Sequence, residues 1–242
     1  DEALKDYALK FDGAVIENLQ VTQEEIDEAF AGMDPYFLET LRQAAANIEN
    51  FHRQQVHKNF VVNDKPGIVL GQKYTPIEKA GVYVPGGTAA YPSTVLMDVI
   101  PAKVAGVSEI VMTTPAGKDG KVNPVILAAA ATAGVTKIFK TGGAQAVAAL
   151  AYGTQSIPAV DKIVGPGNIY VAAAKRKVFG KVGIDMIAGP SEILVLADGG
   201  CNPAWVAADL LSQAEHDKLA SPVLVTDSAD LAKAVQAELE VQ

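Results

Sequence analysis

The chain has 242 residues, of which 49% are hydrophobic and 20% are charged, and its formal net charge is −8. A chain of this length and hydrophobicity can bury one large or two small cores, which excludes a mainly disordered protein. The acidic balance excludes a binder of the nucleic-acid backbone, because such binding depends on clustered lysine and arginine. The single cysteine, Cys201, cannot form an internal disulfide, so the composition favours a reducing compartment.

The sequence predicts no membrane span and no secretion signal. The longest apolar runs, 125–131 and 193–197, are much shorter than the stretch of about 20 residues that crosses a bilayer. The first residues lack a basic segment followed by an apolar one. We therefore expect a cytoplasmic protein, or a plastid protein if an upstream transit peptide was removed.

The first 55 residues are predicted to be helical. Thr22 and Glu25 have the spacing of a capping box, in which each side chain accepts a hydrogen bond from the backbone N–H of the other residue. Asp34 and Pro35 provide the N-cap and the first residue of a long helix. We therefore expect an N-terminal helical segment over residues 1–55.

After residue 60, short β-branched runs alternate with alanine-rich helical stretches. Such alternation requires crossover connections and therefore mostly parallel sheets, so the sequence predicts an α/β protein. The predicted elements are strand 82–84, helix 93–105, strand 110–113, helix 124–133, strand 137–139, helix 144–151, strand 162–164, helix 168–179, strand 193–196, helix 203–215, strand 223–226 and helix 229–239.

These elements are too many for one small sheet, so we predict two Rossmann-like, mostly parallel α/β units, one inserted in the other. The glycine- and proline-rich stretches 81–87 and 187–191 mark the joins. The inserted domain is predicted to span residues 81–189. The other, discontinuous domain is predicted to comprise residues 56–80 and 190–242.

Four glycine-bearing loops follow predicted strands, where parallel sheets bind their ligands. Glycine lets a phosphate approach the backbone closely, so the four loops together indicate an anion site of the nucleotide type. Each loop alone is more often an ordinary tight turn, and the absence of a G-x-G-x-x-G run leaves no Rossmann fingerprint. The loops are 84–88, 141–145, 164–168 and 188–192.

The one basic cluster, residues 175–177, falls at the end of a predicted helix. Cations are favourable at that end of a helix, and a solvated terminus is the usual environment of such a run. We therefore interpret all three side chains as solvent-exposed. Cys201 lies in a loop before a helix and is interpreted as a filler residue and not as a nucleophile.

Asp209, Gln213 and His216 share one stripe of a predicted helix, because they are spaced at i, i+4 and i+7. An imidazole nitrogen and an amide oxygen can bind a divalent metal, although glutamine is an uncommon zinc ligand. The spacing alone favours a solvated polar face. A catalytic zinc needs at least three protein donors, so further donors would be carboxylates of this chain, residues outside it, or residues of a second chain.

Five blocks of the chain resemble, in sequence and in order, the histidinol dehydrogenase family. The resemblance covers essentially the whole chain, and the last two blocks are the most specific. The blocks are 81–87 (GVYVPGG), 142–146 (GGAQA), 161–168 (DKIVGPGN), 183–192 (GIDMIAGPSE) and 208–217 (ADLLSQAEHD).

The resemblance implies an enzyme that oxidises L-histidinol to L-histidine through the aldehyde. Two NAD molecules would accept a hydride in turn, one zinc ion would hold the substrate, and the full-length protein would be a homodimer. The resemblance also assigns roles to residues of this chain. These are NAD contacts for Tyr83, Gln145 and Asn168, substrate contacts for Ser191, Gln213 and His216, and zinc ligation for Gln213 and His216.

The resemblance places the glutamate–histidine pair that performs acid–base chemistry, and the remaining zinc ligands, beyond Gln242. It also places the start of the family upstream of Asp1. We therefore expect no catalytic acid–base residue in this chain, which would bind NAD weakly and would not turn over histidinol, since each missing acid–base group costs about 10²–10⁴-fold in rate. Asp209 matches no assigned position and would at most orient a ligand.

Two other functions stay open on the sequence alone. One is a zinc- and NAD-dependent dehydrogenase of another small amino alcohol or of a polyol such as a sulfonated diol. The other is a non-catalytic nucleotide-binding or assembly module. Comparison of NADH formation from histidinol and from diols by the full-length protein would separate the two dehydrogenases, and a glutamate–histidine pair encoded downstream in the same reading frame would count against the module.

Overall fold

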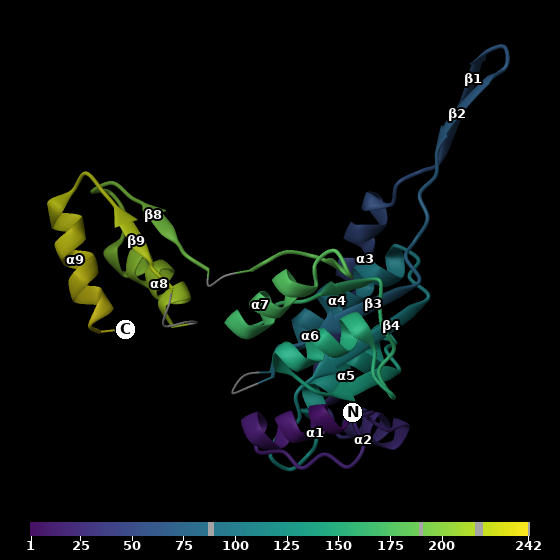
Figure 1. The fold of residues 1–242 in the computed structure, drawn as a ribbon. Helices are drawn as coiled ribbons and strands as arrows, with labels where there is room; N and C mark the ends of the chain where they lie inside the picture. The colour runs from purple at the N-terminus through teal and green to yellow at the C-terminus, as the bar shows by residue number, and fades with distance from the viewer. Residues whose placement is uncertain (87–89, 189–190, 216–219, 242) are drawn as a thin grey trace. The chain divides into compact units, whose positions relative to one another are not determined.

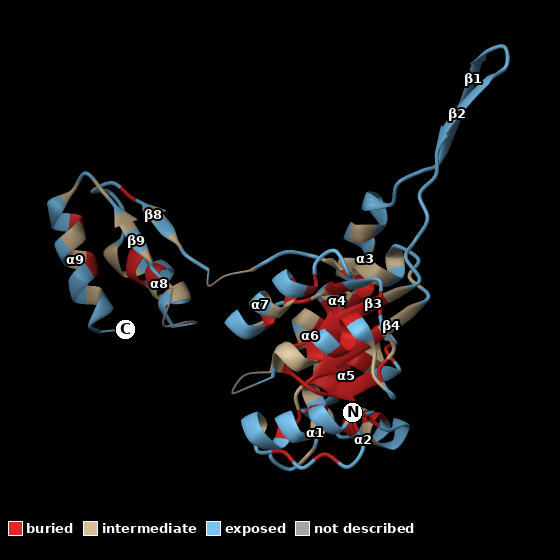
Figure 2. Ribbon diagram, in the orientation of Figure 1, coloured by how far each residue is buried: buried red, intermediate tan, exposed pale blue. Residues whose placement is uncertain are grey.

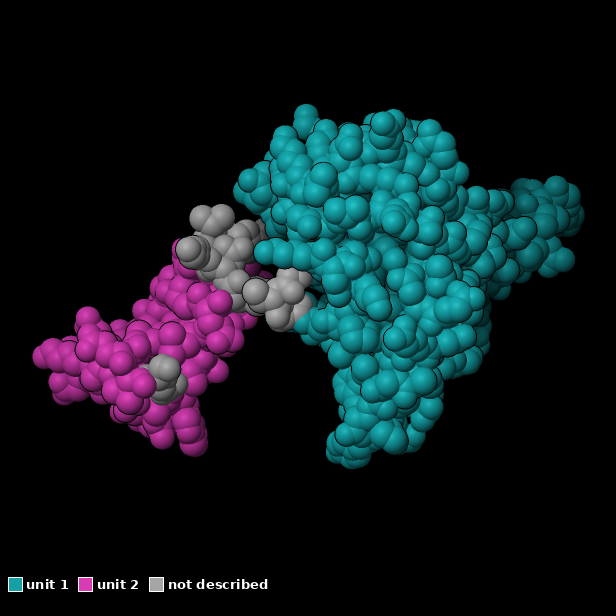
Figure 3. Space-filling model, turned by 90° about the horizontal axis from the view of Figure 1, so that it is seen from below, with its two compact units in different colours: residues 1–188 teal, residues 189–242 magenta. Residues whose placement is uncertain are grey.

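The computed structural model describes residues 1–86, 90–188, 191–215 and 220–241. The chain forms two compact units, residues 1–188 (unit 1) and 189–242 (unit 2), which Figure 3 shows in different colours. Each unit combines parallel strands with helices, which confirms the predicted α/β class. No helix in the described part of the chain is long and apolar enough to span a bilayer.

A five-stranded parallel sheet forms the centre of unit 1, with the order β5-β4-β3-β6-β7. The chain starts in the middle of this sheet, extends to one edge, and then returns to the other side of its first strand. The order therefore reverses between β3 and β6, and open α/β sheets bind ligands at such a reversal. The strands are β3 (Lys79–Tyr83), β4 (Glu109–Thr114), β5 (Lys137–Lys140), β6 (Lys162–Val164) and β7 (Gly183–Ile184).

Both faces of this sheet are buried under helices, as Figure 2 shows by the red strands at its centre. Successive strand residues point to opposite faces, so Val82 belongs to one apolar core and Tyr83 to the other. The first core contains α4 (Pro92–Val104) and α5 (Pro124–Ala133). The second contains α6 (Gly143–Tyr152) and α7 (Ile169–Val178).

The N-terminal helices pack onto the same two cores. Helices α2 (Gln23–Ala31) and α3 (Pro35–His52) contact α5 and α4, whereas α1 (Glu2–Tyr7) contacts α6. The predicted capping box is present, because the Thr22 side chain and the Glu25 backbone are hydrogen-bonded in both directions. The one-turn helices 8–12 and 53–55 complete this predominantly helical segment.

An antiparallel hairpin of β1 (Phe60–Lys65) and β2 (Ile68–Gln72), which was not predicted, projects from unit 1 (Figure 1). Every residue of both strands is exposed. The local signal was the turn at Pro66 and Gly67 between two β-branched runs, with Gly67 at a φ of 76°. The predicted discontinuous domain of 56–80 with 190–242 stays a prediction.

Unit 2 contains a parallel pair, β8 (Leu194–Leu196) and β9 (Val223–Val225), with two helices, α8 (Pro203–Ala214) and α9 (Ala229–Leu239). Asn202 caps α8 through its side-chain oxygen, and Ser228 caps α9 in the same way. The buried core consists of Ala197, Val206, Ala207, Leu210, Leu231 and Val235.

The central strands should dominate the stability of unit 1. We expect Ile163→Ala, which empties a fully buried position in β6, to lower the free energy of unfolding by about 2–5 kcal/mol. The matched variant Ile169→Ala removes the same atoms from a side chain that is 63% exposed, and should change stability by less than about 0.5 kcal/mol. Urea denaturation followed by far-UV circular dichroism measures both values, and equal losses would contradict the assignment of the core.

Candidate functional site

The candidate site lies at the carboxyl edge of the sheet in unit 1. Tyr83 pairs with Thr113, which pairs with Phe139, so β3, β4 and β5 reach this edge at the same level. On the other side of β3, Val82 pairs with Val164 at the end of β6. Three of the four predicted loops therefore leave the sheet at this edge, although residues 87 and 88 of the loop 84–88 lie outside the described residues. The fourth, 188–192, includes residues 189 and 190, which lie outside the described residues.

The loops that follow β3, β4 and β5 pack against one another through Pro115 and two glycines. A Cβ atom added to Gly142 would lie 2.8 Å from the Pro115 Cβ, and one added to Gly86 would overlap the Pro115 ring. Real Cβ atoms do not approach carbon so closely, so both positions require glycine. The glycines therefore have a packing role that the sequence analysis did not predict.

Tyr83 is buried and connects two of these loops. Its hydroxyl accepts a hydrogen bond of 3.0 Å from the backbone N–H of Gly143, the first residue of α6. Burial raises the pKa of the Tyr83 phenol, the hydrogen bond from Gly143 opposes that shift, and the charge of Asp12 adds to it. The phenol is therefore protonated at neutral pH and keeps its own O–H as a donor.

Gln145 and Asn168 stand at the beginnings of two helices that leave this edge. Gln145 is half-buried in the first turn of α6, and its Oε1 would lie 2.8 Å from a Cβ on Gly143. Asn168 is the N-cap of α7, where its Oδ1 accepts hydrogen bonds from Tyr170 N–H (3.1 Å) and Val171 N–H (3.2 Å). The same side chain carries two amide N–H groups, which are hydrogen-bond donors. The three predicted NAD residues thus lie at the end of β3, in the first turn of α6 and at the N-cap of α7.

Lys175 is only 3% exposed, so its prediction as a solvated residue was wrong, whereas Arg176 and Lys177 are exposed as predicted. The Lys175 ammonium donates to the Gly165 carbonyl at 2.5 Å and to Asp185 Oδ1 at 2.6 Å. The Gly165 N–H donates to Asp185 Oδ2 at 2.9 Å. Both backbone groups of Gly165 are therefore held by charged side chains.

A third charged residue, Asp98 of α4, faces the same glycine. A Cβ on Gly165 would lie 3.2 Å from Asp98 Oδ2, a buried oxygen with no hydrogen-bond partner among the described residues. Burial, followed by the charge of Asp185, raises the pKa of Asp98 to about 7, against the opposing effect of Lys175. The residues of this cluster are too far apart in the sequence for their spacing to indicate it.

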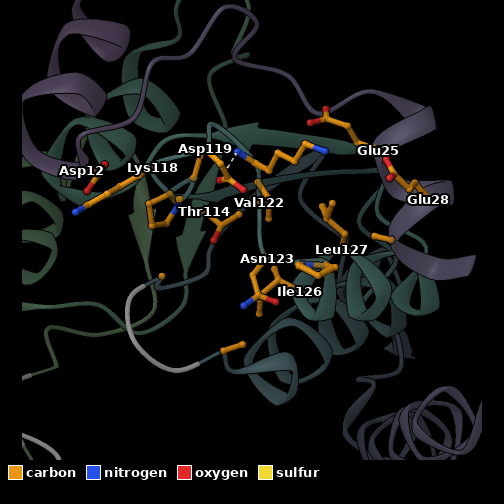
Figure 4. A pocket seen from close by; sticks show the side chains of 18 of the residues that line it. Asp12, Glu25, Glu28, Thr114, Lys118, Asp119, Val122, Asn123, Ile126 and Leu127 are labelled. Carbon is orange, nitrogen blue, oxygen red and sulfur yellow. Dashed lines mark hydrogen bonds between the residues drawn. The ribbon is translucent and has the colours of Figure 1, made fainter. Parts of the chain in front are cut away.

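A cavity of about 930 Å³ opens beside the loops after β3 and β4 (Figure 4), a size typical of small-molecule sites. Apolar side chains of α5 and the preceding loop form part of its wall, among them Val122, Ile126 and Leu127. Figure 4 shows Asp12 beside Lys118 at one end and Glu25 beside Glu28, both on α2, at the other. The charged residues of the lining are Asp12, Glu25, Glu28, Lys118, Asp119 and Lys121.

The predicted substrate and zinc residues belong to unit 2. Ser191 is exposed just before β8, and Gln213 is half-buried in the last turn of α8. His216 lies outside the described residues. Asp209, one turn before Gln213, is exposed. Within the described ranges, no three histidine, cysteine, aspartate or glutamate side chains are grouped so as to hold a metal ion.

Sheet order, loop glycines and cavity together define a Rossmann-type α/β protein, since the order matches the first five strands of that fold. A family model described as histidinol dehydrogenase matches residues 1–242. The chain therefore belongs to the histidinol dehydrogenase family.

The names of similar proteins are consistent with this family assignment. The histidinol dehydrogenases of Geobacillus kaustophilus and Bacillus subtilis are 60% and 59% identical over 242 residues, which are 100% of this chain and 57% of each relative. A solved histidinol dehydrogenase from Elizabethkingia anophelis superposes with a TM-score of 0.90 at 42% identity, covering 100% of this chain and 56% of that one. The chain thus spans little more than half the length of its relatives.

A more distant likeness concerns the fold alone. A salicylaldehyde dehydrogenase from Pseudomonas putida G7 aligns with a TM-score of 0.55 at 15% identity, covering 99% of this chain and 54% of that one.

The hydrogen bond between Tyr83 and Gly143 can be tested by removing one hydroxyl. Tyr83→Phe leaves a partly buried N–H without its acceptor, so we expect a loss of about 1–3 kcal/mol and faster hydrogen exchange at the Gly143 amide. Tyr152→Phe, at a side chain 63% exposed, is the matched control and should change neither quantity. Unchanged exchange at Gly143 in Tyr83→Phe would show that the bond is absent in solution.

The raised pKa of Asp98, about 7, makes part of the stability of unit 1 depend on pH. The folded protein binds the Asp98 proton more tightly than the unfolded chain, so protonation of Asp98 stabilises the fold. This contribution to the free energy of unfolding is complete below about pH 4 and is lost as the pH rises through about 7. Urea midpoints at pH 5 and pH 8.5 should therefore differ more in the parent than in Asp98→Asn. The control Asp209→Asn, at an exposed carboxylate, should keep the parent's difference.

Proposed function

We propose that the protein to which these 242 residues belong oxidises L-histidinol to L-histidine through the aldehyde, with two NAD molecules as hydride acceptors. Family membership and relatives that are about 60% identical and carry this name support the proposal. The observation that carries it is that Tyr83 and Asn168 lie at or just after the ends of β3 and β6, where the strand order reverses, while the first turn of α6, which contains Gln145, is hydrogen-bonded to Tyr83 through Gly143. We propose that these three residues contact NAD.

The carboxyl edge of unit 1 fits a dinucleotide. The amino-terminal turns of α6 and α7 present backbone N–H groups, which favour an anion such as the pyrophosphate. The tight packing of Gly86 and Gly142 on Pro115 keeps side chains out of the space between the loops. Tyr83 and Asn168 add hydrogen-bond donors that can orient the bound cofactor.

The adenosine half of NAD would occupy the cavity beside β4. In Rossmann-type sheets the adenosine ribose lies at the end of the second strand, which is β4 in this order. Thr114 ends β4 and lines the cavity. Ribose hydroxyls need acceptors, and the carboxylates of Asp12, Asp119 and Glu25 on the lining supply them.

We propose that the protein binds zinc, because this chain contains part of a suitable set of ligands. An amide oxygen from Gln213 and an imidazole nitrogen from His216 are suitable donors, and a catalytic site requires at least one more. Among the described residues no three histidine, cysteine, aspartate or glutamate side chains are grouped for a metal, and we propose that the remaining ligands are carboxylates of this chain, other residues of the full protein or residues of a second copy. When bound, the metal would supply a positive charge that holds the amino alcohol in place. We propose that Ser191 also contacts the substrate.

NAD binding can be measured on the chain itself by isothermal titration calorimetry. Gln145→Leu keeps the size of the side chain but removes its polar atoms, and we expect NAD to bind about tenfold more weakly, the loss of about one hydrogen bond to a charged ligand. Gln54→Leu makes the same change at an exposed position outside the site and should leave the affinity unchanged. Equal affinities in the two variants would exclude Gln145 from the site.

The substrate can be identified with the whole protein and zinc. Oxidation of L-histidinol to the acid should yield two NADH per molecule consumed, whereas a sulfonated propanediol should react far more slowly. A preference for the diol would favour a related dehydrogenase. NAD binding without NADH formation from either compound would favour a non-catalytic nucleotide-binding module.

A further inference from the structure

A charged cluster of Lys175, Asp185 and Asp98 surrounds Gly165, which lies between β6 and the proposed NAD contact Asn168. No step of the proposed reaction uses this cluster. Lys175 donates to the Gly165 carbonyl, Asp185 accepts from the Gly165 N–H, and the two side chains form an ion pair of 2.6 Å. Asp98 faces the same residue from α4. Two charged side chains therefore hold the backbone N–H and the carbonyl of Gly165, and a third, Asp98, lies beside this residue.

Gly165 needs such support, because its φ of 113° is a conformation that side-chain-bearing residues rarely adopt and that flexible glycine leaves easily. It immediately follows β6, and Asn168, three residues later, caps α7. The direction in which the chain leaves Gly165 therefore determines where the Asn168 amide and the amino terminus of α7 are placed.

Stability alone does not account for this cluster. A buried ion pair contributes little net stability compared with apolar side chains of the same size. Here one lysine that is only 3% exposed faces two carboxyl groups, and Asp98 Oδ2 has no hydrogen-bond partner in the described part of the chain. Such an arrangement is expensive to bury and specifies one geometry of the loop.

We propose that Lys175, with Asp185 and Asp98, is a positioning group that holds the β6–α7 loop in the conformation that binds NAD. The inference rests on the proposed NAD site and adds residues that do not themselves contact the cofactor. Residues that orient the ligands of a metal change its affinity by about 10–100-fold when they are replaced, and we expect an effect at the lower end of that range for NAD.

The test compares three variants of the 242-residue chain. Lys175→Met removes both hydrogen bonds of the ammonium and leaves Asp185 without its ion-pair partner, so it should lower the melting temperature and weaken NAD binding about tenfold. Adding Asp185→Asn removes the unpaired charge but keeps an amide oxygen for the Gly165 N–H, and it should recover much of the melting temperature but not the NAD affinity. Lys177→Met, at an exposed position on the same helix, should match the parent in both.

Recovery of affinity together with melting temperature in the double variant would overturn the proposal, because the cluster would then act only through stability. Parent-like NAD binding in Lys175→Met would overturn it as well. Absence of NAD binding by the parent would instead refute the proposed cofactor site.

A second measurement needs no NAD. Hydrogen exchange at the amides of Gly165, Tyr170 and Val171 reports the loop and its cap directly. The double variant should exchange faster than the parent at these amides, and at the parent's rate at Val82 in the sheet. Parent-like exchange at all three loop amides would overturn the positioning role, whatever the affinity for NAD.

Discussion

The parallel pairing of β3 with both of its neighbours is the constraint on which unit 1 depends. Val82 lies opposite Met112 on one side and Val164 on the other, and it is fully buried. Because parallel strands end at a common edge, this register brings the connections after β3, β4, β5 and β6 together. The reversal of strand order beside β3 then separates the helices that follow into two layers, with α4 and α5 in one and α6 and α7 in the other.

Contacts between loops shape this edge further. Gly86 and Gly142 are set against Pro115, and the Tyr83 hydroxyl ties β3 to the start of α6. The glycines were expected to let a phosphate approach the backbone. The structure gives them a second role, since the loops could not converge with side chains at these positions. The two roles are compatible, because a site built from closely packed backbone leaves N–H groups, and not side chains, to meet an anion.

Most elements could be predicted because each has a local cause. The helix over 124–133 has Asn123 as N-cap, proline at its first position and Gly134 in the left-handed conformation at its end, all readable from the sequence. The hairpin over 60–72 was missed because its apolar residues are exposed on both faces, so no alternation of burial identifies it. The short strand β7 has only two residues, too few for a periodic pattern.

The positions of site residues were predictable where they follow from strand ends, as for Tyr83 and Asn168. The charged cluster was not predictable, because its environment is set by tertiary contacts. Lys175 belongs to a basic run typical of a solvated helix end, and nothing local distinguishes it from Lys177. Only the fold brings Asp98, 77 positions earlier, and Asp185, 10 positions later, to the glycine that Lys175 reaches.

The separation into two units determines which core holds each part of the proposed chemistry. The proposed NAD residues are fixed by the large sheet of unit 1, whereas Gln213 is fixed by the small core of unit 2, in which Val206 and Leu210 pack with Leu231 and Val235. On α8, that burial leaves Asp209 exposed and Gln213 half-buried. A stripe of polar residues becomes a metal site only when further donors face it, and spacing along one helix carries no information about those donors.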